Sequence, residues 1–573
     1  MKKQLLLMMV LMLTCATAWG QTFNIGGHRA VRDTINNMWL CSIPQSHFGE
    51  DYIATVSFGD DVTDLAIEGE PVANGDEVTF AQVAGGTHYT VTGHMGDSLI
   101  TGYITFTWLP LVEINGEPVN KYVYGTVTVS EPDSAFAEPM LAKMKLRGGA
   151  TNTPDKHKRN YRIKFINEDS TKCNRRFFGL RNDNNWILDA GQMDFLRVRN
   201  RVSTDLWLDM SRKPWYSDSI ANVRNGSRGQ MVEVIMNGGY VGIYNMCEPI
   251  DRKQLKLERY DYENREFHGL LWTAYKWTRT VTMSDPVPRP GGVYWDGFEQ
   301  KYPDFSEIRR TKWDPLENAV YFAGRADEDM NLRVDSMGEY FDLPVMQDYY
   351  IYVVALQALD NESKNIYYSC LDLAGSHRLT MTPWDLDVCL GGNYNPRFDL
   401  PEMVRPDRPV DWISHVPMFD MMQVKSYRSE VIDRYRELRN TWLETENLVS
   451  RYRSAVNELL ESGAAEREEN RWSGDTDLAN KELNLANEMD YVENWIRNRM
   501  AYCDEHVFIE PFIKGDVNGD GEVTIADVNM IIEIILGHRF SDEIMNRADV
   551  NEDLEITIGD INAIIEIILK KAY

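Results

Sequence analysis

The chain has few cysteines for its length and no long hydrophobic run. Seven of its 573 residues are cysteines, scattered without a CxxC pair. Structural zinc sites usually take closely paired ligands, so this spacing argues against such a site and against a cysteine nucleophile. Cys15 belongs to the leader described next. The remaining six form an even number, which permits disulfides in an exported protein without assigning their pairs.

No stretch is long and apolar enough to anchor the chain permanently across a membrane. The first twenty residues instead have the layout of a cleaved secretory signal, with Lys2 and Lys3 before an apolar run that ends at Leu13. Small residues at Ala16 and Ala18 then suit cleavage. We therefore expect a signal peptide at residues 1–20. The protein is then secreted or at the cell surface, in the periplasm or on the outer surface of a Gram-negative cell.

Positive charge is also scarce, because the formal net charge is -28. Such an excess repels nucleic acid and anionic lipid, so neither is an expected partner. It favours divalent cations and basic partners, although solubility outside the cell would account for it equally well. Hydrophobic residues make up 43% of the chain, enough for packed cores, and 573 residues are too many for one core.

The pattern along the chain predicts an α+β multidomain protein. Residues 21–135 are rich in Thr, Val, Gly and Asp with short alternating runs, which predicts a β-sandwich-like domain. Residues 136–505 mix strands and helices, including a hairpin at 231–244 turned at Asn237-Gly238, and become mainly helical after about residue 340. Residues 506–573 form a separate all-α module.

The terminal module contains an internal repeat. Residues 516–536 and 549–569 are identical at fifteen of twenty-one aligned positions. Each copy begins with oxygen-bearing residues at the EF-hand spacing, and calcium takes roughly six to eight such oxygens. The expected calcium ligands are Asp516, Asn518, Asp520, the Glu522 carbonyl, Thr524 and Asp527 in the first loop, and Asp549, Asn551, Asp553, the Glu555 carbonyl, Thr557 and Asp560 in the second.

This repeat closely resembles a type I dockerin, the module by which exported proteins dock onto cohesin domains. The resemblance implies bound Ca²⁺ and a cohesin-domain partner. One position departs from the pattern, because Leu554 stands where the loop turn favours glycine, as Gly521 does in the first copy. A leucine there must adopt a backbone angle that glycine takes easily, so we expect a weaker second calcium site.

Three segments of the central region suit phosphoryl transfer from ATP. Asp360 and Asn365 form a DxxxxN arrangement after an apolar helix, and Trp384-Asp385-Leu386-Asp387 follows two short strands. A Lys- and Arg-rich pair of strands lies at 143–165. The reaction needs a carboxylate near the acceptor hydroxyl, an Asn and an Asp for Mg²⁺, and cations near the phosphates. Each motif alone is common, and their combination carries the interpretation.

The same region resembles the CotH (spore coat protein H) kinase family over roughly residues 110–505. The likeness rests on LRGGATN with KRNYRIKF, DFLRVRNRVSTDLW, VEVIMNGGYVGIYNMCEPID, LDNESKNIYY, and TPWDLD with the glycine pair that follows. Family members are secreted atypical protein kinases with a kinase-like fold that act on Ser or Thr. The strand pair at 143–165 lacks a GxGxxG, so only Gly148 and Gly149 are available to cradle phosphates.

Carried over by position, the resemblance implies a role for each matching residue. Asp360 becomes the catalytic carboxylate, and Asn365 and Asp385 become Mg²⁺ ligands, with Asp387 able to share the metal. The ATP contacts implied are Lys164, or Lys158 as the other lysine, with Arg147 nearby and Glu248 in the segment that can close over adenine. The protein substrate would supply a Ser or Thr acceptor.

Two other functions stay open from the sequence. The kinase-like fold and the β-domain could serve a non-catalytic structural or adhesive surface protein. A glycan-active protein in polysaccharide catabolism is the third reading, because dockerins often accompany carbohydrate-degrading domains and the chain has 15 Trp and 28 Tyr. That reading needs a carboxylate pair flanking a sugar site, and no pair stands out in the sequence.

Overall fold

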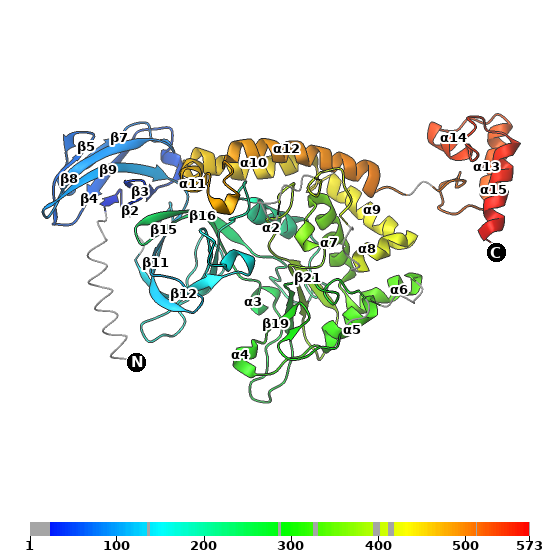
Figure 1. Cartoon of the computed structure of the whole chain (residues 1–573), viewed down its shortest axis with the longest axis horizontal. Coiled ribbons are helices and arrows are strands. Elements are labelled where there is room, and N and C mark those ends of the chain that lie inside the picture. The colour runs from blue at the N-terminus through cyan, green and yellow to red at the C-terminus, as the bar shows by residue number, and fades with distance from the viewer. Residues whose placement is uncertain are drawn as a thin grey trace.

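The computed structural model describes residues 23–134, 138–284, 288–324, 330–393, 402–410, 417–510 and 513–571. The expected signal peptide lies outside these residues. The structure combines a β-rich N-terminal region, a central region of strands and helices, and a small helical unit at the C-terminal end (Figure 1). The α+β class expected from the sequence is confirmed.

The N-terminal region is one hydrogen-bonded sheet of nine strands in the order β6-β5-β8-β9-β3-β2-β1-β4-β7. Its strands are β1 (Phe23–Ile25), β2 (His28–Asp33), β3 (Met38–Ser42), β4 (Tyr52–Ser57), β5 (Val62–Ile67), β6 (Glu70–Pro71), β7 (Glu77–Phe80), β8 (His88–Met95) and β9 (Ser98–Thr107). Alternate residues of β4 are buried, as a strand with one face on a core requires.

The sheet folds over a single core. The ring of Phe80 on the edge strand β7 lies 5.0 Å from that of Phe106 on β9, near the middle of the sheet. Tyr52 of β4 joins the same aromatic cluster. The two faces expected of a sandwich therefore come from one continuous sheet.

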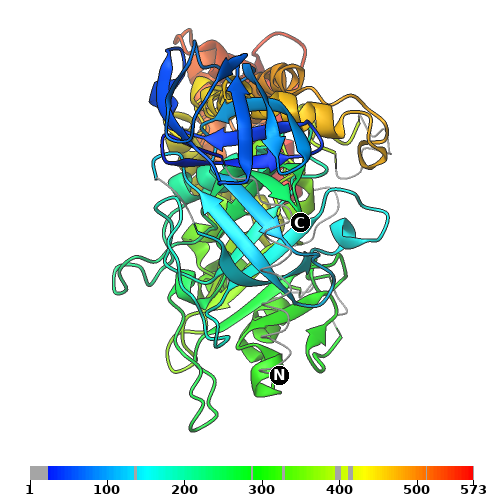
Figure 2. The same cartoon turned by 90° about the vertical axis from the view of Figure 1, so that its left-hand side faces the viewer.

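A closed barrel follows, in the strand order β10-β11-β12-β13-β14-β16-β15. Its strands are β10 (Leu111–Asn115), β11 (Val123–Ser130), β12 (Met140–Arg147), β13 (Asn160–Phe165), β14 (Asn185–Asp189), β15 (Gly229–Met236) and β16 (Gly239–Cys247). The last two form the hairpin expected at Asn237-Gly238. In Figure 2 the barrel lies next to the N-terminal sheet.

The barrel crosses the domain boundary expected at residue 135. Strands β10 and β11 precede that position, yet they pair with β12 and β15 of the barrel. Composition offers no signal for this division, because Val- and Thr-rich strands look alike in a sheet and in a barrel.

A third sheet has the order β18-β19-β17-β20-β21. Its strands are β17 (Leu270–Ala274), β18 (Tyr294–Trp295), β19 (Phe298–Tyr302), β20 (Ile366–Cys370) and β21 (Leu379–Pro383). Helix α7 (Leu343–Leu356) packs against β21 and is buried on nearly every side, so it forms the centre of the largest core.

The other helices surround these sheets. They are α2 (Arg199–Met210), α3 (Arg252–Leu255), α4 (Phe305–Ile308), α5 (Asp314–Ala323), α6 (Met330–Tyr340), α8 (Pro417–Asp420), α9 (Lys425–Arg439), α10 (Thr445–Glu461), α11 (Ala464–Trp472) and α12 (Leu485–Tyr502). Figure 1 shows α10, α11 and α12 running along one side of the central region, with α11 beside the barrel. This is the helical part expected after residue 340.

The C-terminal unit consists of α13 (Ile525–Ile535), α14 (Asp542–Ala548) and α15 (Ile558–Lys571). The repeated helices α13 and α15 pack together through buried residues such as Ile531 and Ile564. Short calcium-loop candidates precede both helices, which places the acidic residues of the repeat at the two helix N-termini.

The six cysteines after the leader form no disulfide within the described chain. All are buried free thiols that pack in the cores, namely Cys41, Cys173, Cys247, Cys370, Cys389 and Cys503. Across the parts that the structure describes, no helix has both the length and the apolar character needed to cross a membrane.

Candidate functional site

A β-hairpin brings the two central motifs together. Ile366 at the start of β20 pairs with Pro383 at the end of β21, so the residues just outside the hairpin are neighbours. The amide of Trp384 donates to the carbonyl of Asn365 at 2.9 Å. Asn365 and Asp385 both have positive φ, 56° and 62°. Such angles are uncommon for residues with side chains, although Asn and Asp adopt them more readily than most. They fix the backbone of both residues at this edge of the hairpin.

Asp360 is held in the same place by three donors. Its Oδ1 accepts a hydrogen bond from Trp277 Nε1 at 3.0 Å, and its Oδ2 accepts one from Asn365 Nδ2 at 3.0 Å. The Lys364 ammonium forms an ion pair with Oδ2. The structure therefore joins both ends of the DxxxxN motif by a direct contact, and Lys364 and Trp277 are site residues that the sequence reasoning missed.

Asp385 and Asp387 lie among other carboxylates. Burial, the charge of Asp189 and, less strongly, that of Asp360 raise the pKa of Asp385 to about 6, while Lys364 and Arg147 oppose the rise. Burial and the charges of Asp385 and Asp189 raise the pKa of Asp387 well above its usual value. We call Asp189, Asp360, Asp385 and Asp387 the acidic cluster.

Asp189 is the member that the sequence did not reveal. It ends the buried strand β14 and its Oδ2 accepts a hydrogen bond from Asn200 Nδ2 at 2.6 Å. Asn200 Oδ1 in turn accepts the amide of Leu386 at 3.0 Å. Asn200 thus links Asp189 on the barrel to the segment between Asp385 and Asp387. The sequence signal that could have identified Asp189 is an acidic residue at the end of a hydrophobic strand.

Arg147 faces this group from the end of β12. Its guanidinium lies 4.8 Å from the centre of the Trp384 ring, next to Asp385 in sequence. A cation stacked on an aromatic ring at the rim of an acidic cluster is suited to bind a phosphate.

The two candidate lysines have different surroundings. Lys164 pairs in register with Lys143, whereas Arg147 pairs with Asn160, so Lys164 lies four residues, or about 13 Å, further along the strand pair. Its ammonium sits 5.2 Å from the Tyr122 ring. Sequence alone could not choose, because register between β12 and β13 decides which basic residue reaches the cluster.

Lys158 is buried in an ion-pair network, 1% exposed. Its ammonium donates to Glu468 Oε1 at 2.6 Å and to the carbonyl of Ile243 at 2.7 Å. Arg197 Nε donates to the same Glu468 oxygen at 2.7 Å. Burial alone would raise the pKa of Glu468, but the charges of Lys158 and Arg197 hold it below its usual value. The network ties the barrel to helix α11.

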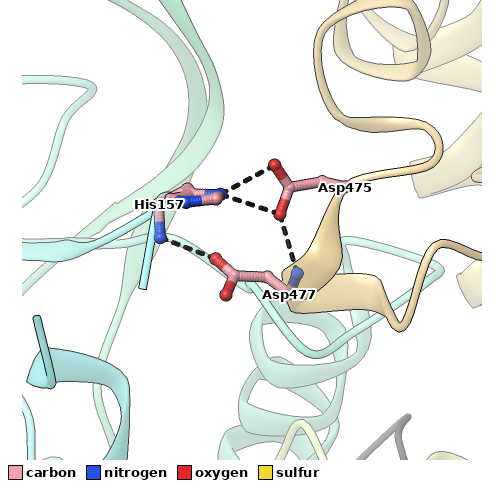
Figure 3. A group of neighbouring side chains, drawn as sticks. All are labelled: His157, Asp475 and Asp477. Atoms are coloured by element: carbon pink, nitrogen blue, oxygen red, sulfur yellow. Dashed lines mark hydrogen bonds and ion pairs between the residues drawn. The ribbon is translucent and has the colours of Figure 1, made fainter. Parts of the chain in front are cut away.

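The residues before Lys158 strengthen that connection (Figure 3). His157 Nδ1 contacts Asp475 Oδ2 at 2.9 Å, and the His157 amide donates to Asp477 Oδ2 at 2.7 Å. Asp477 is 2% exposed and also faces the Lys156 ammonium at 3.5 Å. The three residues Lys156 to Lys158 therefore all bind acidic side chains between 468 and 477.

Glu248 lies just after β16, where the barrel leads into the third sheet. It is fully buried, and its Oε1 accepts hydrogen bonds from the Arg181 amide and from Arg228 Nη2, both at 2.9 Å. Its described contacts are with arginines rather than with the acidic cluster.

The two C-terminal loops share several hydrogen bonds from backbone amides to aspartates. Asp527 accepts the amides of Asn518 at 3.0 Å and Thr524 at 2.8 Å. In the second loop Asp560 accepts the amides of Asn551 at 3.1 Å and Thr557 at 2.8 Å.

The turn positions also match. The amide of Gly521 donates to Asp516, and that of Leu554 donates to Asp549. Leu554 has the positive φ expected of it, 68°, against 82° for Gly521. Asp516 Oδ1 is buried without a hydrogen-bond partner, which a cation in the loop would satisfy.

Comparison with protein families places both regions. The model of a family described as CotH kinase protein matches residues 144–503, more than half of the chain. A type I dockerin domain matches residues 514–569. No curated protein gives a significant match to this chain. The two resemblances drawn from the sequence motifs are confirmed.

Proposed function

Because this chain belongs to the CotH kinase protein family and ends in a type I dockerin, we propose that it is a secreted atypical protein kinase. It transfers the γ-phosphate of ATP to Ser or Thr side chains of an extracellular or cell-surface protein. The observation that carries this proposal is the meeting of Asp360, Asn365 and Asp385 at the end of one β-hairpin. Motifs that are weak separately thus form one group of side chains.

Each residue at this edge has a distinct role. Asp360, oriented by Trp277 and Asn365, accepts the proton of the acceptor hydroxyl. Asn365, Asp385 and Asp387 hold Mg²⁺, and Asp189 is placed to share it. Arg147 binds phosphate oxygens, and Lys158 secures the barrel against α11 rather than contacting ATP by itself.

The donor set fits a hard divalent cation. The pKa values of Asp385 and Asp387 are raised first by burial and then by the neighbouring carboxylates, and a bound cation would offset both effects. When bound, Mg²⁺ would neutralise charge on the ATP phosphates. Lys364 and Arg147 supply the remaining positive charge.

The dockerin would bind Ca²⁺ and dock the protein onto a cohesin domain. Supporting this are the two loops with the same hydrogen-bond scheme and the unsatisfied buried oxygen of Asp516. The ligands proposed are those expected from the EF-hand spacing. Together, the two modules would deliver kinase activity to a cell-surface or extracellular assembly.

Labelled ATP tests the enzyme. Wild-type protein with Mg²⁺ should transfer label to itself or to a basic, Ser-rich acceptor, and Asp360→Asn should lower the rate by about 10²–10⁴-fold. Asp385→Asn should also abolish Mg²⁺-dependent nucleotide binding. Lys164→Met is the matched control and should retain activity. Absence of transfer by folded wild-type protein would favour the non-catalytic structural reading.

Calcium and cohesin binding need a separate test. Calorimetry of the full chain should detect calcium, with one class of sites lost in Asp527→Ala and the other in Asp560→Ala. Capture on an immobilised cohesin domain should require calcium. Capture that is equally strong in a chelator would refute the dockerin assignment.

A further inference from the structure

A cavity of about 280 Å³ lies at the C-terminal end of helix α2. Its charged lining residues are Asp205, Asp209, Arg212, Lys213, Arg224 and Arg228. Within the described chain, no member of the acidic cluster lines it. We call it the α2 cavity.

The two acids of the α2 cavity are neutralised from outside. Arg201 Nε donates to Asp205 at 2.9 Å, and Arg451 Nη2 donates to Asp209 at 2.7 Å. Neither arginine belongs to the lining. The acids therefore offer little charge to the cations that do line the cavity.

The lining cations are less well compensated. Arg228 lies 2.9 Å from Glu248, and Arg224 comes only within 3.9 Å of the same carboxylate, so one negative charge faces two guanidinium groups. The Nε atoms of Arg224 and Arg228 are both buried without a hydrogen-bond partner. Lys213 is exposed and has no carboxylate partner among the described residues. Arg212 is bound to Asp348 at 2.9 Å.

This arrangement leaves a positive cavity in a chain whose net charge is -28. Burying unpaired guanidinium nitrogens is costly unless an acceptor reaches them. Desolvation lowers the pKa of Arg224, and Glu248 opposes this fall while Arg228 and Arg181 add to it, consistent with incomplete compensation of the positive charge. Both carboxylate and phosphate oxygens match the planar donor fork of arginine. A phosphorylated side chain carries close to two negative charges, about twice the charge of a carboxylate, and so compensates several cations at once.

We propose that the α2 cavity binds a phosphate group carried on a polypeptide. Its volume lies just below the range of about 300–1,000 Å³ that encloses drug-sized ligands, so it suits a phosphorylated side chain better than a whole nucleotide. Asn200, which contacts Asp189 of the acidic cluster, is on the same helix as Asp205, about 7.5 Å away along its axis. Helix α2 therefore connects the cavity to the acidic cluster over a short distance along the chain.

The bound polypeptide is the protein substrate of the kinase, an identification that rests on the proposed kinase function. The enzyme would then hold a side chain that is already phosphorylated while a nearby hydroxyl approaches Asp360. Phosphate recognition itself does not require catalysis.

Binding should be measured on the full-length protein without ATP or Mg²⁺. The probe is a fluorescent Ser-rich peptide with one phosphoserine, beside its unphosphorylated form, with inorganic phosphate as competitor. Arg224→Gln and Lys213→Gln are the test variants. Arg259→Gln and Lys481→Gln replace exposed cations that do not line the cavity and serve as controls. Salt concentration is held constant because it screens these contacts.

The phosphopeptide should bind, phosphate should displace it, and Arg224→Gln should weaken binding by about tenfold or more. The controls should bind as the wild type does. Equal binding of both peptides, or wild-type binding by Arg224→Gln, would overturn the proposal. Displacement by ATP but not by phosphate would also overturn it in favour of a nucleotide site. Arg224-dependent phosphopeptide binding by a catalytically inert protein would support the cavity and refute only the kinase.

Discussion

Substitutions in the buried network of Lys158, Glu468 and Arg197 should differ widely in their effect on stability. It contains two cations and one carboxylate, all nearly inaccessible to solvent. Substituting Lys158 leaves a neutral pair, whereas substituting Glu468 leaves two buried cations facing each other. We therefore expect Glu468→Gln to destabilise the protein far more than Lys158→Met.

Hydrogen bonding increases the difference. Glu468 Oε1 accepts from both Lys158 and Arg197, and its Oε2 accepts from the Ile243 amide at 2.7 Å. A glutamine amide would turn its NH₂ toward a donor in either orientation. Removing one partner from a buried ion pair costs about 3–5 kcal/mol, and we expect that range for Glu468→Gln. Lys158→Met loses two hydrogen bonds but no longer buries a surplus charge, so about 1 kcal/mol is expected.

Urea unfolding followed by tryptophan fluorescence measures both values. Residues 513–571 contain no tryptophan, so the signal excludes the dockerin. Lys164→Met is the matched control and should change stability by less than about 0.5 kcal/mol, because this lysine is only partly buried and forms no ion pair within the described residues.

The pH dependence gives a second check with a definite sign. Burial lowers the pKa of Lys158 from 10.5 to about 7, with Glu468 opposing and Arg197 adding to the fall. The folded protein therefore loses that proton before the unfolded chain does. The wild type should gain stability relative to Lys158→Met as pH rises from 7 towards 10. A larger loss of stability in Lys158→Met than in Glu468→Gln would refute a surplus of positive charge in this network.

Three further predictions concern other parts of the chain. Leu554→Gly should remove the steric cost of the positive φ in the second loop and raise the calcium affinity of that loop up to about fivefold in calorimetry. Asp560→Ala should abolish calcium binding there. Glu458→Gln should raise the free energy of unfolding at pH 8. Burial raises the pKa of Glu458, so above pH 4.5 its ionisation destabilises the folded state, and glutamine avoids that cost. Urea unfolding at pH 4 should show no gain in stability. Asp477→Ala should cost about 1–3 kcal/mol in urea unfolding, because it removes a buried carboxylate that accepts the His157 amide and faces the Lys156 ammonium. His157→Ala, at a partly exposed pair, should cost under about 1 kcal/mol.

Much of the architecture can be read from local patterns. The internal repeat and its EF-hand spacing identify the C-terminal module because all its ligands lie within short loops. The Asn237-Gly238 hairpin and the DxxxxN and WDLD motifs are local for the same reason. By contrast, the barrel takes β10 and β11 from a stretch that composition groups with the preceding sheet, since only long-range pairing with β15 distinguishes them.

The site residues that the sequence did not indicate also depend on contacts between distant parts of the chain. Asp189, Asn200 and Trp277 carry no motif of their own, and each reaches the hairpin through the packing of separate elements. The choice between Arg147 and Lys164 depends on the register of β12 against β13, and Lys158 is placed by its ion pair with Glu468 on a distant helix. The basic sequence alone indicates neither. A one-residue change in register would move every side chain to the other face.

Contacts between the barrel and helix α11 explain why residues far along the chain from the acidic cluster affect its geometry. Asp189 and Arg147 belong to the barrel, while Asp360 and Asp385 belong to the third sheet, so the site exists only if these two parts keep a fixed separation. Helix α11 fixes one side of that arrangement through Glu468, and the segment after it adds Asp475 and Asp477. The family match reaches residue 503, well beyond the last motif residue, which is what this dependence requires. Residues far from the chemistry would thus determine whether the four carboxylates of the acidic cluster can share one cation.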